Sequence, residues 1–131
     1  MNEDNIRYEN PAEGVARIML ARPDKHNAIN PQMIYEVNAA FDRAVRDESV
    51  KVIILGADGR NFSAGHDIAD TVADFQAATK ANSPGVSTWS DFTEEYTHGW
   101  YAAEKETYLE SARRWRNLSK PTICTVQGKC I

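Results

Sequence analysis

The sequence predicts a domain of the α/β class, in which helices alternate with the strands of a largely parallel sheet. Residues 52–55 read Val-Ile-Ile-Leu, an apolar run typical of a strand covered on both faces in a parallel sheet. Before this run, apolar side chains recur at helical spacing from Ile34 to Val45. Residues 122–126 read Thr-Ile-Cys-Thr-Val and follow Pro121, and proline is tolerated at the start of a strand. The alternation of strand and helix indicates the fold class.

The amino-terminal part is predicted to form a hairpin. Residues 6–9 and 15–20 have strand-like composition, and the connection between them contains Pro11 and Gly14. Both residue types favour turns. We therefore expect two antiparallel strands joined through residues 10–14.

A helix is predicted to begin at Asn30 and Pro31. The asparagine side chain can cap the first turn, and proline at the first helical position loses no hydrogen bond inside the helix. Residues 47–49, Asp-Glu-Ser, are expected to end it. The predicted buried face consists of Ile34, Val37, Phe41, Ala44 and Val45.

The region between the two predicted parallel strands is less regular. Residues 68–82 are compatible with a helix, and residues 83–87, Ser-Pro-Gly-Val-Ser, with a loop. Residues 93–118 predict one long amphipathic helix. Its buried face is expected to carry Thr97, Tyr101, Tyr108, Ala112 and Trp115.

Length and composition exclude several classes of protein. The chain has 131 residues, 42% of them hydrophobic and 26% charged, which is ordinary for one globular domain. Its formal net charge is −4, and its basic cluster at residues 113–116 (Arg-Arg-Trp-Arg) is best explained as a solvated helix end, so no nucleic-acid partner is expected. No apolar run approaches the roughly 20 residues of a membrane span, and residues 1–5 do not resemble a signal peptide. We expect a cytoplasmic protein.

The cysteines and histidines give no sign of a metal centre. Cys124 and Cys130 lie in or beside an apolar strand, at a spacing typical of neither metal sites nor redox pairs. We expect reduced, buried thiols, because disulfides are rare in the cytosol. The three histidines are scattered along the chain. No metal is predicted.

The segment most informative about function follows the strand predicted at residues 52–55. Residues 60–68 read Arg-Asn-Phe-Ser-Ala-Gly-His-Asp-Ile, and small residues let the main chain approach a ligand closely. The backbone N–H of His66 is a candidate donor to a substrate carbonyl oxygen, as in an oxyanion hole. Asp67 is expected to cap the following turn. Ser63 is not predicted to be a nucleophile, because it lies outside a Gly-x-Ser-x-Gly setting and has no identifiable partner base.

Three segments together resemble the crotonase (enoyl-CoA hydratase/isomerase) superfamily. They are residues 21–30 (ARPDKHNAIN), residues 62–67 (FSAGHD) and residues 120–130 (KPTICTVQGKC). Their order and spacing match the amino-terminal half of that family, and the likeness is weakest between residues 71 and 108. The resemblance implies an α/β fold built as a ββα spiral. Residues 1–131 are expected to be its amino-terminal part, with the first two repeat units, and to end before the glycines that carry the second oxyanion N–H.

The resemblance also implies an acyl-CoA substrate and residues that bind it. Positions that lie against the adenine and phosphates of coenzyme A in relatives are matched by Lys25, His26 and Ala28. Positions around the thioester are matched by Ala64, Gly65, His66, Asp67 and Ile68. Among these, the backbone N–H of His66 is the expected catalytic group, and its imidazole is expected to play the lesser part. No separate cofactor is expected, because coenzyme A is part of the substrate.

The aromatic residues of the less familiar region have two interpretations. They could line an acyl pocket, or they could pack in the core, which is the more usual fate of an aromatic stripe at helical spacing. The residues concerned are Trp89, Tyr96, Trp100 and Tyr101.

The most specific function that the resemblance implies is that of an enoyl-CoA hydratase. The glutamates that activate water in such enzymes are expected after Ile131, so the chain alone is predicted to be inactive. Alternatives within the superfamily are an isomerase, a thioester hydrolase, a decarboxylase and a dehalogenase, and a non-catalytic acyl-CoA-binding module is a further one. We expect a homo-oligomer, a trimer or hexamer, when the fold is complete, or a separate carboxy-terminal chain that completes it.

Overall fold

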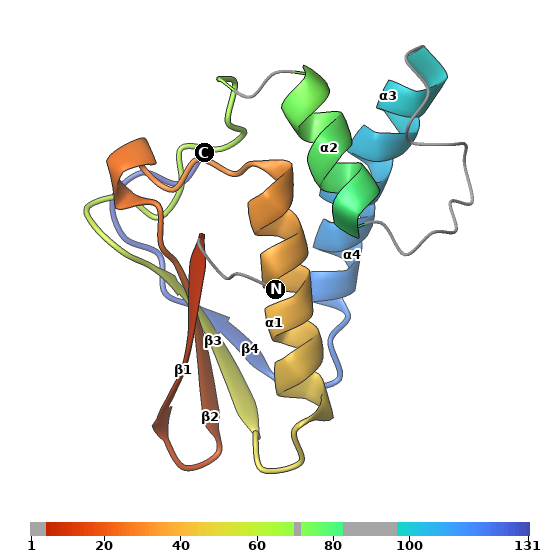
Figure 1. Ribbon diagram of the computed structural model, residues 1–131. Coiled ribbons are helices and arrows are strands. Elements are labelled where there is room, and N and C mark those ends of the chain that lie inside the picture. Colours follow the sequence, from red (N-terminus) through yellow and green to blue (C-terminus); the bar gives the residue numbers. More distant parts are fainter. Residues whose placement is uncertain (1–4, 70–71, 83–96) are drawn as a thin grey trace.

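The computed structural model describes residues 5–69, 72–82 and 97–131. The loop predicted at residues 83–87 lies outside the described residues, as do Trp89 and Tyr96. In chain order (Figure 1), the elements are β1 (Ile6–Ala12), β2 (Val15–Leu20), the 3-10 helix η1 (Pro23–Lys25), α1 (Pro31–Arg46), β3 (Val52–Ala57), α2 (Val72–Asn82), α3 (Thr97–Glu104), the π-helical stretch η2 (Lys105–Glu110), α4 (Ser111–Arg116) and β4 (Thr122–Cys124).

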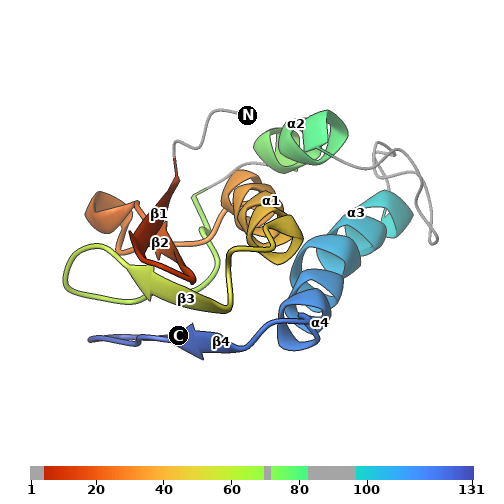
Figure 2. The same ribbon diagram turned by 90° about the horizontal axis from the view of Figure 1, so that it is seen from below.

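A four-stranded sheet in the order β1-β2-β3-β4 forms one layer of the fold, and the α-helices lie against it. The strands β1 and β2 are antiparallel, whereas β2, β3 and β4 run parallel. Figure 2 shows α1 directly against the sheet, with α2, α3 and α4 farther out on the same side. This arrangement confirms the predicted α/β class and the predicted hairpin, helix and parallel strands.

The first strand is longer than its sequence indicates. It continues to Ala12, so the prediction that residues 10–14 form the connection is wrong for most of that segment. The pairing of β1 with β2 becomes irregular after Glu9, and Pro11, which has no N–H, is tolerated at such a bulge on an edge strand. The turn ends at Gly14, which has a left-handed φ of 76°.

The helix α1 begins and ends where the sequence predicts. The Asn30 side chain accepts a 2.9 Å hydrogen bond from the Met33 N–H, and Pro31 is the first helical residue. The last helical residue is Arg46. With side chains of the sheet, the inner face of α1 forms the core, and its buried apolar residues are Met33, Ile34, Tyr35, Val37, Ala40, Phe41 and Ala44.

The strand β3 lies between β2 and β4 and is parallel to both, as predicted. Ile53 is fully buried, but Ile54 and Leu55 are only half-buried. The expectation of a strand covered on both faces is therefore wrong for this chain. The physical reason is that the described α-helices all lie on one side of the sheet (Figure 2).

The strand β4 forms an edge of the sheet, and its side chains are exposed. It ends at Cys124, earlier than the predicted residue 126. Cys124 and Cys130 are free thiols, but both are exposed, so the prediction of buried thiols is wrong. Partial burial of its sulfur, with a smaller contribution from Cys130, raises the pKa of the Cys124 thiol.

The helical segment from Thr97 to Arg116 is continuous through α3, η2 and α4, but its buried face differs from the prediction. Tyr101 is 62% exposed, and Ala112 is exposed as well. For Ala112 the reason is η2, because a π-helical turn holds more residues than an α-helical turn and shifts the positions after it out of phase. Tyr101 precedes η2 and is on the outer side of α3. The buried side chains are small, which permits close packing on the neighbouring helices, and they are Ala102, Ala103, Thr107 and Ser111.

Candidate functional site

Three loops that are far apart in the sequence meet beyond the carboxyl ends of the parallel strands β2, β3 and β4. Short parallel bridges join Ile29 to His66 and Ser63 to Cys130. Figure 1 shows η1, the loop after β3 and the carboxyl end of the chain together at this end of the sheet. In open α/β sheets, ligands bind at the carboxyl ends of the strands.

Asn27 ties the loop after β2 to the loop after β3. It is fully buried and has φ = 53°, a left-handed conformation that asparagine adopts more readily than most residues. Its side chain accepts a 2.9 Å hydrogen bond from the Arg22 N–H and donates to the carbonyl oxygens of Asp58 (2.8 Å) and Asn61 (2.9 Å). One amide group thus fixes two loops that are separated by more than 30 residues.

The Ser63 hydroxyl is part of the same network. It donates to the Asn27 carbonyl oxygen (2.9 Å) and accepts from the Gly65 N–H (3.1 Å). The residue is 3% exposed. The hydroxyl therefore holds the turn in shape.

Gly65 adopts a conformation that few other residues could adopt. Its φ is 84°, in the left-handed region where a side chain causes strain. A β-carbon at this position would also lie 3.3 Å from the Ile131 carbonyl oxygen. The turn therefore needs glycine for its conformation and for the close approach of the chain end.

Most backbone N–H groups of the turn after β3, residues 62–69, donate hydrogen bonds within the described chain, and that of His66 is an exception. Among the described residues, the N–H groups of His66 and Ile68 have no acceptor. The bridge to Ile29 uses the Gly65 carbonyl (2.8 Å) and the Asp67 N–H (2.9 Å), so the His66 N–H is not consumed by it. The N–H groups that do donate are those of Phe62, Ser63, Ala64, Gly65, Asp67 and Ala69.

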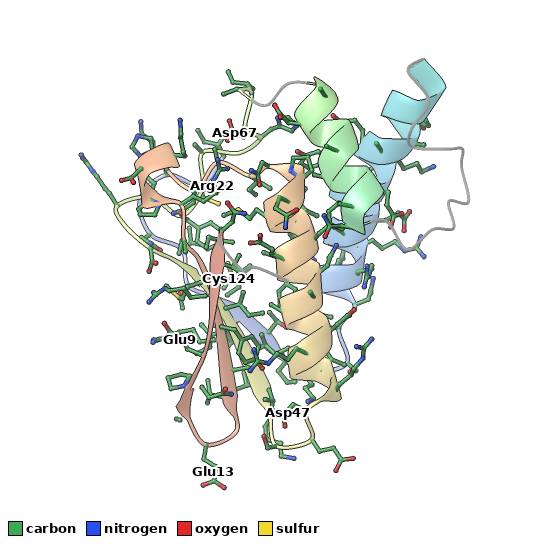
Figure 3. All side chains as sticks on the ribbon, viewed as in Figure 1. Glu9, Glu13, Arg22, Asp47, Asp67 and Cys124 are labelled. Carbon is green, nitrogen blue, oxygen red and sulfur yellow. The ribbon has the colours of Figure 1, made fainter. Side chains whose placement is uncertain are left out.

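Asp67 and Arg22 form a nearly buried ion pair beside the turn (Figure 3). Arg22 Nη2 lies 2.9 Å from Asp67 Oδ2, and the side chains are 16% and 9% exposed. Asp67 Oδ1 accepts a 3.1 Å hydrogen bond from the Ala69 N–H, which is the predicted turn cap. Burial by itself would raise the pKa of Asp67, but the Ala69 N–H, Arg22 and the charge of Lys25 together hold that pKa below its ordinary value. This carboxylate is therefore a structural acceptor.

The residues matched to coenzyme A binding in the loop after β2 lie in different settings. Lys25 is exposed at the end of η1, and His26 follows it with φ = 51°. The His26 carbonyl oxygen accepts the Ala64 N–H (3.0 Å), so the structure brings these two predicted site residues together. The Ala28 carbonyl instead accepts a 2.6 Å hydrogen bond from the Arg22 guanidinium.

A hollow of about 440 Å³ lies beside His26 and Ala64. Two cationic residues, Arg60 and Lys129, contribute to its lining, although their sequence context alone does not mark them as binding residues. Cationic side chains around a concave surface suit phosphate groups. The complete lining is His26, Arg60, Asn61, Ala64, Gly128, Lys129 and Ile131, without Lys25, Ala28 or Ile68.

The imidazole of His66 lies beside the helical segment that runs from Thr97 to Arg116. Its Nε2 lies 4.0 Å from Glu104 Oε1, and its ring centroid lies 4.9 Å from that of Tyr108, with the planes tilted by 37°. Glu104 and Tyr108 are four positions apart and can share a helix face. The sequence does not single out Glu104, because nothing local shows which helix face meets the loop after β3.

Two predicted binding residues have largely exposed side chains. Ile68 is 92% exposed and Tyr101 is 62% exposed, so neither lines an enclosed acyl pocket in the described chain. The side chain of Trp100 lies outside the part of the chain that the structure describes. The helix expected from residue 68 begins only at Val72, because Asp67 and the residues after it form a turn.

The described residues contain neither a candidate metal site nor a helix that could span a membrane. No three His, Cys, Asp or Glu side chains of the described ranges form a group that could hold a metal ion. Within the same ranges, every helix is too short or too polar to cross a membrane.

Comparison with known proteins places this arrangement in a family. The sequence profile of the enoyl-CoA hydratase/isomerase family matches residues 10–96. This match covers the loop after β2, α1 and the turn that contains His66. The chain belongs to the enoyl-CoA hydratase/isomerase family.

Individual relatives carry several activities in their names. The chain is 39% identical over 134 residues to the protein named "Putative enoyl-CoA hydratase EchA13" of Mycobacterium tuberculosis, covering 96% of this chain and 40% of the relative. It is 26% identical over 129 residues to the human mitochondrial Δ(3,5)-Δ(2,4)-dienoyl-CoA isomerase, covering 98% of this chain and 36% of that protein. It is also 39% identical over 69 residues to 4-chlorobenzoyl coenzyme A dehalogenase-2 of an Arthrobacter species, covering 53% of this chain and 25% of that protein.

Solved structures share the fold. The crystal structure of an enoyl-CoA hydratase from Shewanella pealeana superposes with a TM-score of 0.71 at 26% identity, covering 97% of this chain and 40% of the other. A structure described as a probable enoyl-CoA hydratase from Mycobacterium thermoresistibile superposes with a TM-score of 0.69 at 36% identity, covering 96% and 42% of the two chains. The crotonase-like fold is thereby confirmed. The chain spans about two-fifths of the length of the relatives that it matches.

Proposed function

We propose that this chain supplies part of the active site of an acyl-CoA-processing enzyme, most specifically an enoyl-CoA hydratase. The observation that carries the proposal is the His66 N–H, which has no acceptor among the described residues although most of its neighbours on the turn donate. A donor held in a rigid turn is what a developing thioester enolate requires, because it needs no reorganisation when negative charge forms on the oxygen.

In the proposed reaction, the thioester oxygen accepts the His66 N–H while water adds across the conjugated double bond. The hydrogen bonds of Asn27 and Ser63 support this step indirectly, because they hold the two loops that shape the turn. A second donor and the carboxylates that move protons are expected outside these 131 residues. We therefore expect the chain by itself to be inactive.

Coenzyme A is proposed to bind on the side of the turn where the 440 Å³ hollow lies. Arg60 and Lys129 line that hollow and can form charge-assisted hydrogen bonds with its phosphates. Lys25 and His26 lie in the adjoining loop and would contact the nucleotide. No cofactor beyond the substrate is proposed, and neither is a metal. A trimer or hexamer, or completion by a separate carboxy-terminal chain, and a cytoplasmic location remain parts of this proposal.

The names of the relatives include two activities other than hydration. An isomerase aligns over 98% of this chain and a dehalogenase over 53% of it. An isomerisation and a dehalogenation, in which negative charge also develops on a thioester oxygen, are therefore the alternative reactions. We favour hydration because the relative named "Putative enoyl-CoA hydratase EchA13" aligns over nearly the whole chain at 39% identity.

The test is hydration of crotonyl-CoA by the complete enzyme of which this chain is proposed to be a part, followed as loss of the ultraviolet absorbance of the conjugated double bond. Gly65→Val is expected to lower kcat by about 10² or more, because loss of one oxyanion donor has an effect of that order. Gly14→Val is the matched control, since Gly14 has a similar φ of 76° but lies in the hairpin turn. It should reduce stability and leave the rate per folded molecule unchanged.

A third variant separates the backbone from the side chain. His66→Ala keeps the N–H and should lose far less activity on crotonyl-CoA than Gly65→Val. If the two lose equally while coenzyme A still binds, the imidazole carries the chemistry and the backbone assignment is wrong. Tight binding of crotonyl-CoA without turnover would favour the non-catalytic binding module.

A further inference from the structure

The side chain of Asn61, in the loop after β3, lies between residues of the two other loops that meet at this site. Its Oδ1 accepts a 3.1 Å hydrogen bond from the Lys129 N–H, and its Nδ2 lies 3.2 Å from Nδ1 of the His26 imidazole. Asn61 is 9% exposed, and all three residues line the 440 Å³ hollow. One amide group therefore joins two walls of the proposed coenzyme A site.

The Lys129 N–H determines the orientation of the Asn61 amide. A main-chain N–H can only donate, so the amide atom that faces it is the oxygen. The NH2 group then faces His26, and since this group also can only donate, Nδ1 of the imidazole must accept. A neutral imidazole carries one proton, which is consequently on Nε2. The tautomer of His26 is thus set by a residue of another loop.

The main chain of Lys129 is a firm reference for this orientation. Its carbonyl oxygen accepts hydrogen bonds from the N–H groups of Phe62 (3.0 Å) and Ser63 (3.2 Å). The preceding residue, Gly128, permits the close approach of the two loops, because a β-carbon there would lie 2.8 Å from Asn61 Oδ1. The Asn61 amide cannot turn over without losing its bond to a residue that is also held at its carbonyl.

The consequence for a ligand lies on the opposite side of the imidazole ring. The two ring nitrogens face widely different directions, so Nε2 faces away from Asn61. His26 is exposed and lines the hollow, so its Nε2–H is a donor for a ligand bound there. Phosphate, ribose and adenine all offer hydrogen-bond acceptors, whereas the other tautomer would set a lone pair against them. Arg60 and Lys129 supply positive charge to the hollow, and His26 supplies a directed, neutral donor.

We propose that Asn61 is a positioning residue for the nucleotide part of the CoA thioester, because its amide holds the His26 imidazole with the proton on Nε2 and so fixes the donor that the nucleotide meets. This inference rests on the proposed function, since it takes the hollow as the coenzyme A site. Asn61 acts through His26 and touches no reacting atom. It should therefore govern the affinity for the nucleotide and not the rate of the chemical step.

The test compares two substrates of the complete enzyme, crotonyl-CoA and crotonyl-pantetheine, which carries the same reacting thioester without the nucleotide. Asn61→Leu removes the amide at similar volume and releases the imidazole. KM for crotonyl-CoA should rise about tenfold, the effect of one lost hydrogen bond to a charged ligand, while kcat stays within about twofold. The kinetics of crotonyl-pantetheine should be unaltered, whereas a distorted turn would impair both substrates.

Two further measurements show whether Asn61 acts through His26. His26→Gln presents a side-chain N–H donor that needs no tautomer, so adding Asn61→Leu to His26→Gln should change KM by less than about twofold. NMR of isotope-labelled histidine reports the tautomer directly. Nδ1 of His26 should be unprotonated in the native enzyme, and both tautomers should be present in Asn61→Leu.

Asn117→Leu is the matched control. Asn117 is exposed and donates to the Arg113 carbonyl (2.7 Å) at the end of α4, so neither substrate should be affected. The proposal is overturned if Asn61→Leu leaves KM for crotonyl-CoA unchanged, impairs both substrates equally or keeps its full effect beside His26→Gln, or if Nδ1 of His26 carries the proton. Absence of crotonyl-CoA hydration by the native enzyme would instead contradict the proposed function. Calorimetric affinities of the same variants for coenzyme A would then test the inference separately.

Discussion

The loop junction around Asn27 and the outer edge of the sheet at β4 are stabilised in different ways. At the junction, buried polar side chains bond to main-chain groups of distant loops, and each bond needs a particular donor or acceptor. At β4, the side chains are exposed, and the strand is attached to β3 through main-chain pairing. Side-chain chemistry therefore determines the first region, whereas almost any strand-forming sequence could make the second.

The difference shows where this chain has little tolerance for substitution. A buried acceptor or donor that loses its partner is left without water or protein to replace it, which costs about 1–3 kcal/mol for each group. An exposed side chain on an edge strand keeps its contact with water in the folded and the unfolded state. Substitutions at the junction should consequently alter both stability and the shape of the proposed site.

The largest effect is expected from Asn27→Asp. The replacement has the same shape, but it sets a carboxylate oxygen against the carbonyl oxygens of Asp58 and Asn61, which now accept hydrogen bonds from the amide. We expect the free energy of unfolding to fall by about 3–5 kcal/mol, because an uncompensated charge is buried. Urea denaturation of the native protein and of the variant measures this change in the free energy of unfolding.

Asn10→Asp provides the control for that substitution. The Asn10 amide donates to the Val15 carbonyl (3.3 Å) at an exposed position of the hairpin, where water can replace the bond, so a change within about 0.5 kcal/mol is expected. Equal effects of the two substitutions would contradict the distinction between a specific and a tolerant region.

A smaller, pH-dependent effect is expected from Asp67→Asn. At neutral pH the variant should be less stable by about 1–3 kcal/mol, because Arg22 loses its nearly buried partner. The pKa of Asp67 is lower in the folded chain than its ordinary value, so its contribution is complete above the unfolded-state pKa of about 3.9 and is lost as pH falls through the folded-state value. The stability difference between the two proteins should therefore shrink in acid.

Urea titrations repeated between neutral and acidic pH check this behaviour. Asp42→Asn is the control, since the Asp42 side chain is 41% exposed and pairs with Arg114 at the surface. That variant should differ little from the parent at any pH. A difference for Asp67→Asn that stays constant into acid would show that the ion pair does not stabilise the turn.

The smallest effect is expected from Ile123→Thr in β4. Ile123 is 54% exposed, and threonine is also a good strand former, so the free energy of unfolding should change by no more than about 0.5 kcal/mol. Ile53→Thr, in the adjacent strand and 0% exposed, should cost about 2–4 kcal/mol. If the two variants are equally destabilised, the outer face of β4 is covered in the native protein.

The elements with local signals were predictable from the sequence. The cap at Asn30 and Pro31 located α1, and its apolar spacing identified the helix face that packs on the sheet. The residues after β3 indicated a turn, and Gly65 has the left-handed φ that a glycine allows. Such signals depend on a few consecutive residues, so they can be read without knowledge of the fold.

Other features were not predictable, because they depend on where distant segments lie. Three of them are the π-helical stretch that shifts Ala112 out of the predicted buried face, the exposure of Cys124 at a sheet edge, and the irregular pairing that lets β1 continue past Pro11. Each follows from the packing of neighbouring elements. Local propensity has no information about such packing.

The sequence by itself determined the alternation of strand and helix and the turn that presents His66, because residue spacing and backbone preference act over short distances. Only the tertiary structure decided that Asn27 joins two loops across 31 and 34 residues, that Arg22 pairs with Asp67, and that Glu104 faces His66. These contacts form when the chain folds back on itself. The physical reason is that a side-chain hydrogen bond or ion pair depends on position in space, which a linear pattern does not contain.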